Sequence, residues 1–547
     1  MTHLKAAHCW LLASSTMCLT ATASSEPAEL RPPTVECLLV VAGKDGDLMP
    51  GRNGDRFGHI VNPGLEIVHN GRGVITAVVE PHMARRGPMC REIWQFADGQ
   101  MTLLNVDRAV LPGGDGAMAT MSKVSIARTQ STFTNPLGAG GGETYFDMFE
   151  PGVGRGIMVR RLLQGENNMN RNTREGLWYC ENGESSLVAR TGQQCPDSPA
   201  GHQFLELRVS QPPVTDGQGL VAFAATVAVN GDDRDRRTGI WMGPKDKLAR
   251  VAYFGEPARL GGNVFWDMSD LTIDRKGRLH FLDQTPHHTG RQNEGISGQW
   301  MFDGTGFTKR IAPGMKTKEG HVIRTIVCAT YPCANEEGTA LFAGEIVAEG
   351  PFPMAIFMVN DDGVHTLLVN GQAATGMQPA SIVDLNGRRM FALSQTGDWA
   401  AVLVKTDQPA DPRANERMCL WRLRPGKAEV VAYEDGPLGD LAAYRIRGLS
   451  PALGVSIQGE VLFSAELQAT DLGAKEPKIS GVWTGTPAAK RLVTRFPMPV
   501  TMGTRGSKTI QNFVPIRGSM FDTDGAVHSV VRFSDRSGAI VRFVPQK

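Results

Sequence analysis

A short element that recurs along the whole chain restricts its fold more than any other feature. The element is Asn, Asp or Ser, then two residues, then Gly, and its copies are spaced by about 65 residues in a chain of 547. The first residue can hydrogen-bond its own backbone and the glycine supplies a positive φ, so each copy predicts a tight turn between antiparallel strands. The copies are Asn70/Gly73, Asp216/Gly219, Asp274/Gly277, Asn335/Gly338, Ser394/Gly397, Ser456/Gly459 and Asp522/Gly525, with a blurred one at Asn135/Gly138.

A second marker keeps step with the turn. A bulky residue ends a short strand after each turn, and six of the nine tryptophans occupy this slot. We interpret these rings as packing between neighbouring sheets rather than stacking on a cofactor. With the strands on either side, each unit supplies four strands, which make one propeller blade. The slot residues are Trp94, Trp178, Trp241, Trp300, Phe357, Trp421, Trp483 and Val541.

The two ends of the repeat region complement each other. The last unit stops after Ile540–Phe543 without a fourth strand, whereas Glu36–Ala42 reads as a strand with no unit of its own. We therefore predict an all-β chain, a β-propeller of eight four-stranded blades closed by the N-terminal strand, which leaves no large open edge. The propeller is expected to be one domain, residues 36–547. In the sixth unit Ser394/Gly397 is preferred as the turn over Asp384–Gly387, since it lies closer to the usual distance from the aromatic slot.

The N-terminal segment predicts export. Residues 1–23 carry one charge in the first part, Lys5, then a run of apolar and small residues and an A-x-A site at Ala21–Ala23, which is typical of a signal peptide. Residues 24–35 are expected to be a linker, and the mature chain to be periplasmic or extracellular. No later stretch approaches the roughly 20 apolar residues of a membrane helix.

Seven cysteines remain after such a leader is removed. In an oxidising compartment some of them should pair. The sequence predicts bridges Cys328–Cys333, across a proline, and Cys180–Cys195, around one hairpin. The alternative is that all seven are reduced, buried side chains.

The order of strand, Asp-Gly turn, strand, loop and Trp strand is similar to that of WD-repeat chains, although the WD signature is absent. The chain more closely resembles a bacterial family of exported tandem-repeat proteins with N-x-x-G-x-x-A-F repeats. Asp216–Phe223 carries this motif almost fully, and Asp274–Phe281 and Asn335–Phe342 carry its turn and its Phe. The resemblance covers about residues 36–547 and implies the fold and export, but no catalytic residue.

Candidate binding residues are sought in the variable loops between second and third strands, because loops on a rigid scaffold commonly bind ligands. These loops include Glu80–Cys90, Glu150–Glu175, Asn230–Thr238 and Asp283–Ser297. Arginines gather in these loops, and their guanidinium groups suit carboxylate or phosphate, although neighbouring carboxylates such as Asp232 could neutralise them. A histidine pair in one loop suggests a metal, but no third ligand accompanies it, so we expect neither metal nor cofactor. The candidates are Arg85, Arg86, Arg160, Arg161, Arg234, Arg236, Arg237, His287, His288 and Arg291.

Two functions remain open at this stage. The first is an exported binding or surface-interaction protein whose extracellular ligand is an anionic polymer or a protein, acting as a monomer. The alternative is a secreted hydrolase or lyase acting on a saccharide or another polymer, because scattered Asp and Glu residues leave room for a carboxylate pair. Charge is balanced, with 57 basic and 56 acidic residues, so a nucleic-acid partner is not expected.

Overall fold

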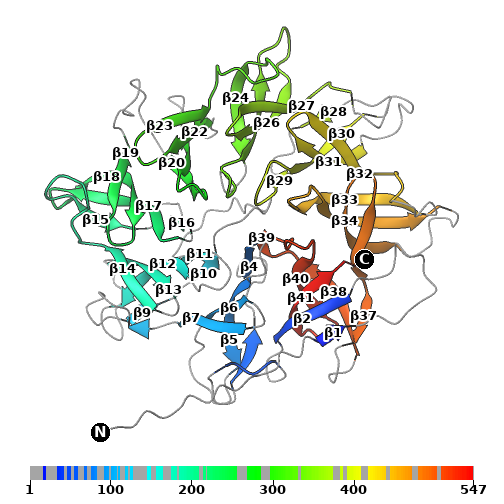
Figure 1. Cartoon of the computed structure of the whole chain (residues 1–547), viewed down its shortest axis with the longest axis horizontal. Helices are drawn as coiled ribbons and strands as arrows, with labels where there is room; N and C mark the ends of the chain where they lie inside the picture. Colours follow the sequence, from blue (N-terminus) through cyan, green and yellow to red (C-terminus); the bar gives the residue numbers. More distant parts are fainter. Residues whose placement is uncertain are drawn as a thin grey trace.

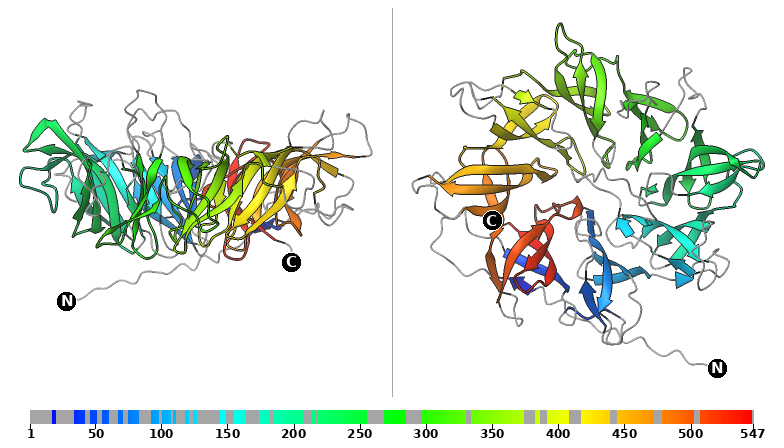
Figure 2. Two further views of the ribbon diagram at one scale, coloured as in Figure 1. Left: turned by 90° about the horizontal axis from the view of Figure 1, so that it is seen from above. Right: turned by 180° about the vertical axis from the view of Figure 1, so that it is seen from behind.

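The chain is all-β, and the strands of its described residues form eight sheets in a computed structural model (Figure 1). The sheets follow one another around a common centre in chain order, and seen from the side they form a flat disc (Figure 2). This arrangement is that of a β-propeller. The structure describes residues 17–19, 34–41, 46–50, 55–59, 67–70, 75–82, 92–97, 100–106, 109–110, 118–120, 124–126, 144–148, 155–163, 174–181, 184–207, 213–216, 218–254, 268–284, 296–329, 334–373, 382–385, 391–407, 417–438, 444–470, 478–501 and 507–545.

Most sheets are built from four consecutive antiparallel strands, with short additional strands in some. The first four sheets contain β3 (Arg56–His59), β4 (Ile67–Asn70), β5 (Ile75–His82), β6 (Glu92–Ala97) and β7 (Gln100–Val106); β8 (Ala109–Val110), β9 (Met118–Thr120), β10 (Val124–Ile126), β11 (Thr144–Met148), β12 (Arg155–Leu163), β13 (Arg174–Glu181) and β14 (Glu184–Arg190); β15 (Gln203–Glu206), β16 (Val214–Thr215), β17 (Leu220–Val229), β18 (Asp232–Pro244) and β19 (Ala249–Tyr253); and β20 (Met268–Ile273), β21 (Leu279–Gln284), β22 (Ile296–Phe302) and β23 (Phe307–Ile311).

The other four sheets continue the series to the C-terminus and take in the N-terminal strands. They contain β24 (Ile323–Ala329), β25 (Ala340–Ile346), β26 (Met354–Asn360) and β27 (Gly363–Val369); β28 (Ile382–Asp384), β29 (Phe391–Leu393), β30 (Ala400–Thr406), β31 (Arg417–Arg424) and β32 (Lys427–Tyr433); β33 (Tyr444–Val455), β34 (Val461–Ala469), β35 (Ile479–Gly485) and β36 (Lys490–Phe496); and β1 (Met17–Leu19), β2 (Thr34–Val41), β37 (Met498–Thr501), β38 (Ser507–Val514), β40 (Val527–Phe533) and β41 (Gly538–Val544), while β39 (Arg517–Ser519) pairs with β4.

The recurrent Asn/Asp/Ser-x-x-Gly element forms the turn between first and second strands. In the fourth sheet, Asp274 Oδ1 accepts the backbone N–H groups of Lys276 and Arg278 at 2.9 Å each. The glycine of this turn, Gly277, has φ +73° and donates its N–H to the Asp274 carbonyl at 3.0 Å. The turn that contains Gly397 (φ +81°) precedes β30, so Ser394/Gly397 is the turn of the sixth repeat, as predicted.

The aromatic slot falls on the third strand of each sheet, and its residues are almost fully buried. The register with the fourth strand shifts at this residue, for example between Ile240 and Trp241. Such a bulge twists the strand locally and re-aims the ring. The hydrophobic clusters draw on neighbouring sheets: one packs Ile240 of the third sheet with Phe281 and Trp300 of the fourth. The rings therefore seal the junctions between sheets, as predicted.

The two ends of the chain meet in one sheet. Strand β2 lies beside β41 along its length, with Val35 opposite Phe543 and Val40 opposite Ala539. The guanidinium of Arg542 adds an ion pair to Glu36 at 2.9 Å. The predicted pairing of residues 36–42 with the last strand is therefore present for the residues described. Strand β1 lies on the outer side of β2, within the segment predicted to be the leader.

Two predicted loops are strands instead. The segment Asn230–Thr238 was expected to be a variable loop, but β17 and β18 form one long hairpin that turns at Asn230 and Gly231, both at positive φ. Asp232–Arg237 are six consecutive charged residues, so the segment has no apolar residues at every second position to indicate a strand. Likewise β12 lies inside the expected loop Glu150–Glu175, so the first-to-second-strand connection of the second sheet falls after Met148 rather than at Asn135/Gly138, which lies outside the described residues.

The predicted cysteine bridges fare differently. Cys195 is a free, buried thiol, so the bridge to Cys180 is not formed in this structure. Burial raises the pKa of this thiol to about 12. The reason for the absent bridge is register: Cys180 on β13 lies opposite Ser185, while the N–H of Cys195 binds the carbonyl of His202 at 2.7 Å in the next segment. Cys333 lies outside the described residues, so its bridge to Cys328 stays a prediction.

Among the described residues, the structure contains no helix that is long and apolar enough to cross a membrane.

Candidate functional site

A strongly charged junction lies between the fourth and fifth sheets, where turns from both sheets meet. Neighbouring strands are antiparallel throughout the fourth and fifth sheets, so the turn before β21 and the turn before β27 emerge at the same end. The first of these turns carries Lys276 and Arg278, and the second carries Asp361. Residues more than 80 positions apart in sequence are thereby brought into contact.

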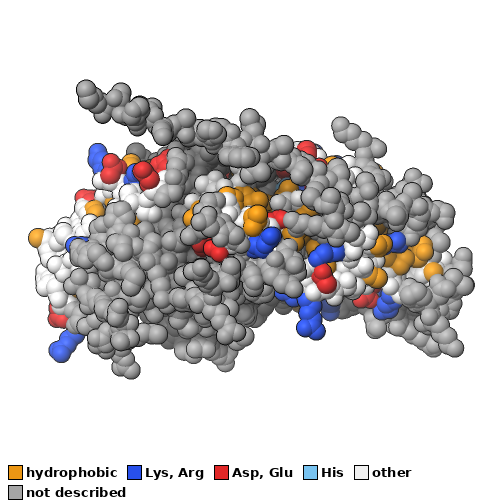
Figure 3. Space-filling model, turned by 90° about the horizontal axis from the view of Figure 1, so that it is seen from below, with side chains coloured by type: hydrophobic (Ala, Val, Ile, Leu, Met, Phe, Trp, Pro, Cys, Tyr) orange, Lys and Arg blue, Asp and Glu red, His pale blue; other side chains and the backbone are white. Residues whose placement is uncertain are grey.

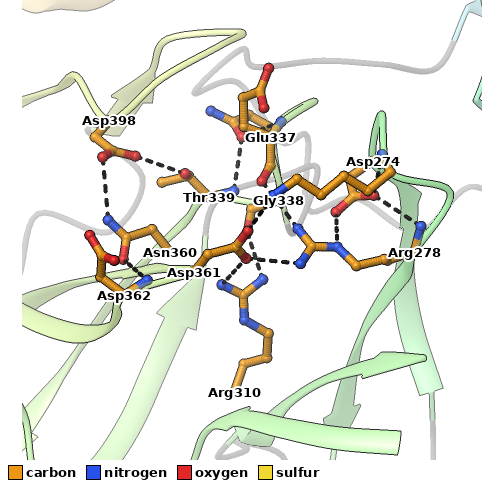
Figure 4. Close-up of polar contacts among 12 residues, drawn as sticks. Asp274, Arg278, Arg310, Glu337, Gly338, Thr339, Asn360, Asp361, Asp362 and Asp398 are labelled. Carbon is orange, nitrogen blue, oxygen red and sulfur yellow. Dashed lines mark hydrogen bonds and ion pairs between the residues drawn. The ribbon is translucent and has the colours of Figure 1, made fainter. Parts of the chain in front are cut away.

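Asp361 is the centre of this junction (Figure 4). Its carboxylate accepts hydrogen bonds from Lys276 Nζ at 2.6 Å and from Arg278 Nη1 at 2.9 Å. A third cation, Arg310 on β23, places Nη2 at 3.7 Å from Asp361 Oδ1. Burial alone would raise the pKa of Asp361, but the hydrogen bonds from Lys276 and Arg278 outweigh it and hold the pKa below its usual value. The carboxylate is therefore ionised near neutral pH.

The two arginines are fixed by further contacts. Arg278 donates Nε to Asp274 Oδ2 at 2.6 Å and Nη2 to the carbonyl of Glu337 at 3.4 Å. Arg310 is buried and donates Nη1 to the carbonyl of Gly338 at 3.0 Å. Both guanidinium groups thus join the fourth sheet to the turn between β24 and β25 of the fifth sheet, as the close-up in Figure 4 shows.

The carboxylate that binds Nε of Arg278 is itself paired with a buried imidazole. Asp274 Oδ2 lies 3.0 Å from Nε2 of His280, and both side chains are fully buried. Burial works against ionisation of Asp274, but bonds from His280 and Arg278 lower its pKa to about 2. Burial lowers the pKa of His280, so the ring is neutral and donates from Nε2.

A cavity of about 510 Å³ opens beside this network. Its volume falls in the range of small-molecule sites, about 300–1,000 Å³. Five cationic residues and one carboxylate are among the described residues that line it, so the lining carries a net positive charge. We call this cavity the basic pocket. Its lining residues are Arg278, Met301, Thr308, Lys309, Arg310, Met315, Lys316, Thr317, Lys318, Asn360, Asp361, Gly363 and Val364.

One wall of the basic pocket is the segment 312–322, which links β23 to β24. Within it the N–H of Thr317 binds the carbonyl of His321 at 2.8 Å, which closes a tight hairpin. Glu319 fastens this hairpin to β27: one carboxylate oxygen lies 3.2 Å from His365 Nδ1 and the other accepts the N–H of Thr366 at 2.6 Å. The exposed side chains of Lys316 and Lys318 are therefore carried on a segment with a fixed position.

Figure 3 shows one face of the molecule, on which the described Lys and Arg side chains lie in several separate places, some of them beside Asp or Glu side chains. The described residues contain no group of three or more His, Cys, Asp or Glu side chains placed to hold a metal ion.

The arginines singled out from the sequence lie elsewhere. Arg234, Arg236 and Arg237 are exposed on β18, and Arg160 and Arg161 belong to β12, of whose side chains the structure describes nothing. Strand β18 belongs to the third sheet and β12 to the second, whereas the basic pocket lies between the fourth and fifth. The remaining candidates, Arg85, Arg86, His287, His288 and Arg291, lie outside the described residues.

Sequence reasoning did not find the basic pocket, although one signal was present. The twelve residues from Phe307 to Lys318 contain Lys309, Arg310, Lys316 and Lys318 and no Asp or Glu. A run of one charge sign in a balanced chain is a local feature that could have marked this segment.

Residues 137–316, a third of the chain, match a family of unknown function (DUF7453). No curated protein matches the chain. Among solved structures, it is similar to the polysaccharide lyase Uly1, with 10% identity and a TM-score of 0.31 over 83% of this chain and 95% of that chain. It is also similar to the β-propeller domain of the trilobed protease of Pyrococcus furiosus (13% identity, TM-score 0.25, 61% and 94% covered). A third is the α-L-arabinanase of Penicillium chrysogenum (8% identity, TM-score 0.26, 67% and 92% covered).

Proposed function

We propose that this chain is an exported binding protein, a closed ring of eight blades that holds an anionic ligand in the basic pocket. The observation that carries the proposal is the charge of the pocket: five cationic side chains face one carboxylate around a cavity of about 510 Å³. An anion that enters the pocket would replace water around these cations with charge-assisted hydrogen bonds.

The single carboxylate of the pocket favours binding over glycoside chemistry. Hydrolysis of a glycosidic bond ordinarily uses two carboxyl groups, one of which must be protonated at the start. Among the described residues, Asp361 is the only carboxylate that lines the basic pocket, and its contacts with Lys276, Arg278 and Arg310 keep it ionised. A group held in this way is suited to positioning cations and not to proton donation.

Export and closure belong to the same proposal. Cleavage after Ala23 would remove β1 and leave residues 36–547 as one ring that β2 closes against β41. N-terminal sequencing of the exported protein tests this: a start at Ser24 supports the leader, and an intact Met1 in exported material contradicts it.

Binding is tested with the mature chain and labelled dextran sulfate, with neutral dextran as the reference ligand. We expect affinity for dextran sulfate only, falling as salt rises, because the contact is electrostatic. Replacing both Lys316 and Lys318 by Gln should weaken binding at least tenfold. Lys247→Gln removes one positive charge from an exposed residue of another sheet and should leave the affinity unchanged, whereas Lys316→Gln and Lys318→Gln should each weaken it. Equal binding by the double variant, or none by the wild type, would refute the pocket as the site.

A further inference from the structure

The two arginines of the basic pocket already use their hydrogen-bond donors on other protein groups, whereas its lysines do not bind a carboxylate among the described residues. Arg278 uses all three of its nitrogens on Asp274, Asp361 and the Glu337 carbonyl. Arg310 directs one terminal nitrogen to the Gly338 carbonyl and the other toward Asp361. Neither guanidinium therefore presents a free planar fork to a ligand. Such a fork is the group that matches the two coplanar oxygens of a carboxylate.

The remaining cations are lysines. Lys309 lines the pocket from β23, with its Nζ 4.9 Å from the centre of the Trp300 ring, and Lys316 and Lys318 line it from the segment 312–322. None of the three has a carboxylate partner among the residues that the structure describes. Each ammonium is a compact charge with three donors and no preferred plane.

The stem of one lysine is held in place by the neighbouring sheet. The N–H of Lys318 binds the carbonyl of Val364 at 2.8 Å. Beside it, Gly363 has φ +126°, and a Cβ at this position would lie 3.1 Å from Lys318 Cε. Glycine at 363 thus leaves room for the lysine stem, so the ammonium is positioned before any ligand arrives, which lowers the entropic cost of binding.

A sulfate or phosphate ester suits such a set of donors better than a carboxylate does. Its terminal oxygens form a pyramid, and each can accept a bond from a different ammonium, whereas a carboxylate offers two oxygens in one plane. Resting on the proposed function, we infer that the basic pocket selects a tetrahedral oxyanion, a sulfate or phosphate ester carried on a saccharide-sized group, over a carboxylate. The volume of about 510 Å³ leaves room for a sugar ring beside the oxyanion.

Three ligands on one sugar ring test the inference: glucose 6-sulfate, glucose 6-phosphate and glucuronate. Affinities for the mature wild-type chain are measured by calorimetry, and a second pair, dextran sulfate and carboxymethyl dextran of matched charge density, covers ligands longer than one ring. We expect the tetrahedral esters to bind at least tenfold tighter than the carboxylates. Comparison of sulfate with phosphate identifies which ester is preferred, and a phosphate affinity that rises between pH 5 and 7 while sulfate stays constant would mark recognition of the dianion.

A variant of the central carboxylate gives an independent arm. Asp361→Asn should free Nη1 of Arg278 and Nη2 of Arg310 while their other contacts remain, so the affinity for glucuronate should rise and the preference for sulfate and phosphate esters over carboxylates should become smaller. If carboxylates bind as tightly as sulfates, and the binding still needs Lys316 and Lys318, the inference fails while the proposed function stands. If none of these anions binds, the proposed function itself fails. An unaltered preference in a folded Asp361→Asn variant would contradict the role assigned to the two arginines.

Discussion

At position 338 the backbone and the surrounding side chains both require glycine. Gly338 has φ +80°, and a Cβ there would lie 2.9 Å from both Arg278 Nη2 and Asp274 Oδ2. We expect Gly338→Ala to cost about 2–4 kcal/mol, from the strained backbone and from displacement of the buried ion pair. It should also weaken the binding of dextran sulfate, because Arg278 lines the basic pocket. Urea denaturation and binding assays measure the two effects.

Gly397 provides a matched control for this substitution. It occupies the same place in the next turn, with φ +81°, but no atom lies within 4 Å of its added Cβ. Gly397→Ala should therefore cost only the backbone strain, about 1–2 kcal/mol, and leave binding unchanged. Equal effects of the two substitutions on stability and binding would mean that the contacts of Gly338 do not matter.

A second residue-scale prediction concerns Asp270 on β20, which has a left-handed backbone at φ +56°. Burial raises the pKa of its carboxyl from 3.8 to about 7. A raised carboxyl pKa contributes stability that is complete below pH 4 and is lost as the pH rises through 7. Asp270→Asn removes this dependence, and asparagine tolerates the left-handed region.

The variant should therefore be more stable than the wild type at pH 8 by about 1–3 kcal/mol. One pKa unit corresponds to about 1.4 kcal/mol, and the partial exposure of the residue reduces the full effect. The measurement is the difference in unfolding free energy between variant and wild type at pH 4, 6 and 8. A difference that does not change with pH would show that the carboxyl titrates normally.

At the scale of elements, the hairpin that carries Lys316 and Lys318 depends on Glu319. Its carboxylate joins the hairpin to His365 and to the N–H of Thr366 on β27. Glu319→Gln keeps the shape but loses the charge, which should weaken both bonds and let the hairpin move. We expect about a three- to tenfold loss of affinity for dextran sulfate, with little change in stability, because charged pairs at half-exposed sites contribute about 0–1 kcal/mol.

This prediction has an electrostatic side that a control must address. Removing a negative charge near the basic pocket would by itself favour an anion, so a loss of affinity can come only from altered positioning. Glu349→Gln removes the same charge from an exposed loop of the same sheet and should leave the affinity unchanged. A gain of affinity in Glu319→Gln would show that the hairpin needs no fastening.

Elements with a local chemical cause could be predicted from the sequence. The turns follow from a side-chain acceptor and a glycine three residues later, and the aromatic slot follows from a ring that must cover the next sheet. The first half of β18 could not be predicted, because Asp232–Arg237 are all charged and lie in a hairpin whose stability comes from pairing with β17. Its order depends on the partner strand and not on an apolar face.

For the whole molecule, the site depends on the packing of the fourth sheet against the fifth. Arg278, Arg310, Lys318 and Asp361 come from four segments that meet only when two sheets pack together. Sequence patterns of one strand or one loop carry no information on such a meeting. The predicted loops stand out by the number of arginines close together in the sequence, whereas the pocket lies where turns of neighbouring sheets meet.

The last prediction concerns β2, which pairs with β41 and which we propose closes the ring. Three side chains of β2 are buried where it packs beside β41: Val35, Leu39 and Val40. Burial of each contributes about 1.5–3 kcal/mol to the free energy of unfolding. A chain that begins at Ala42 should therefore lose at least about 3 kcal/mol of unfolding free energy. It should also associate through the exposed edge of β41, because an unpaired strand is a template for pairing. A chain that begins at Thr34 keeps β2 and should match the chain that begins at Ser24 in both properties. Denaturant titration and size-exclusion chromatography compare the three. If the chain that begins at Ala42 unfolds at the same denaturant concentration and stays monomeric, β2 does not close the ring, and the first and last sheets hold together through their side-chain packing alone.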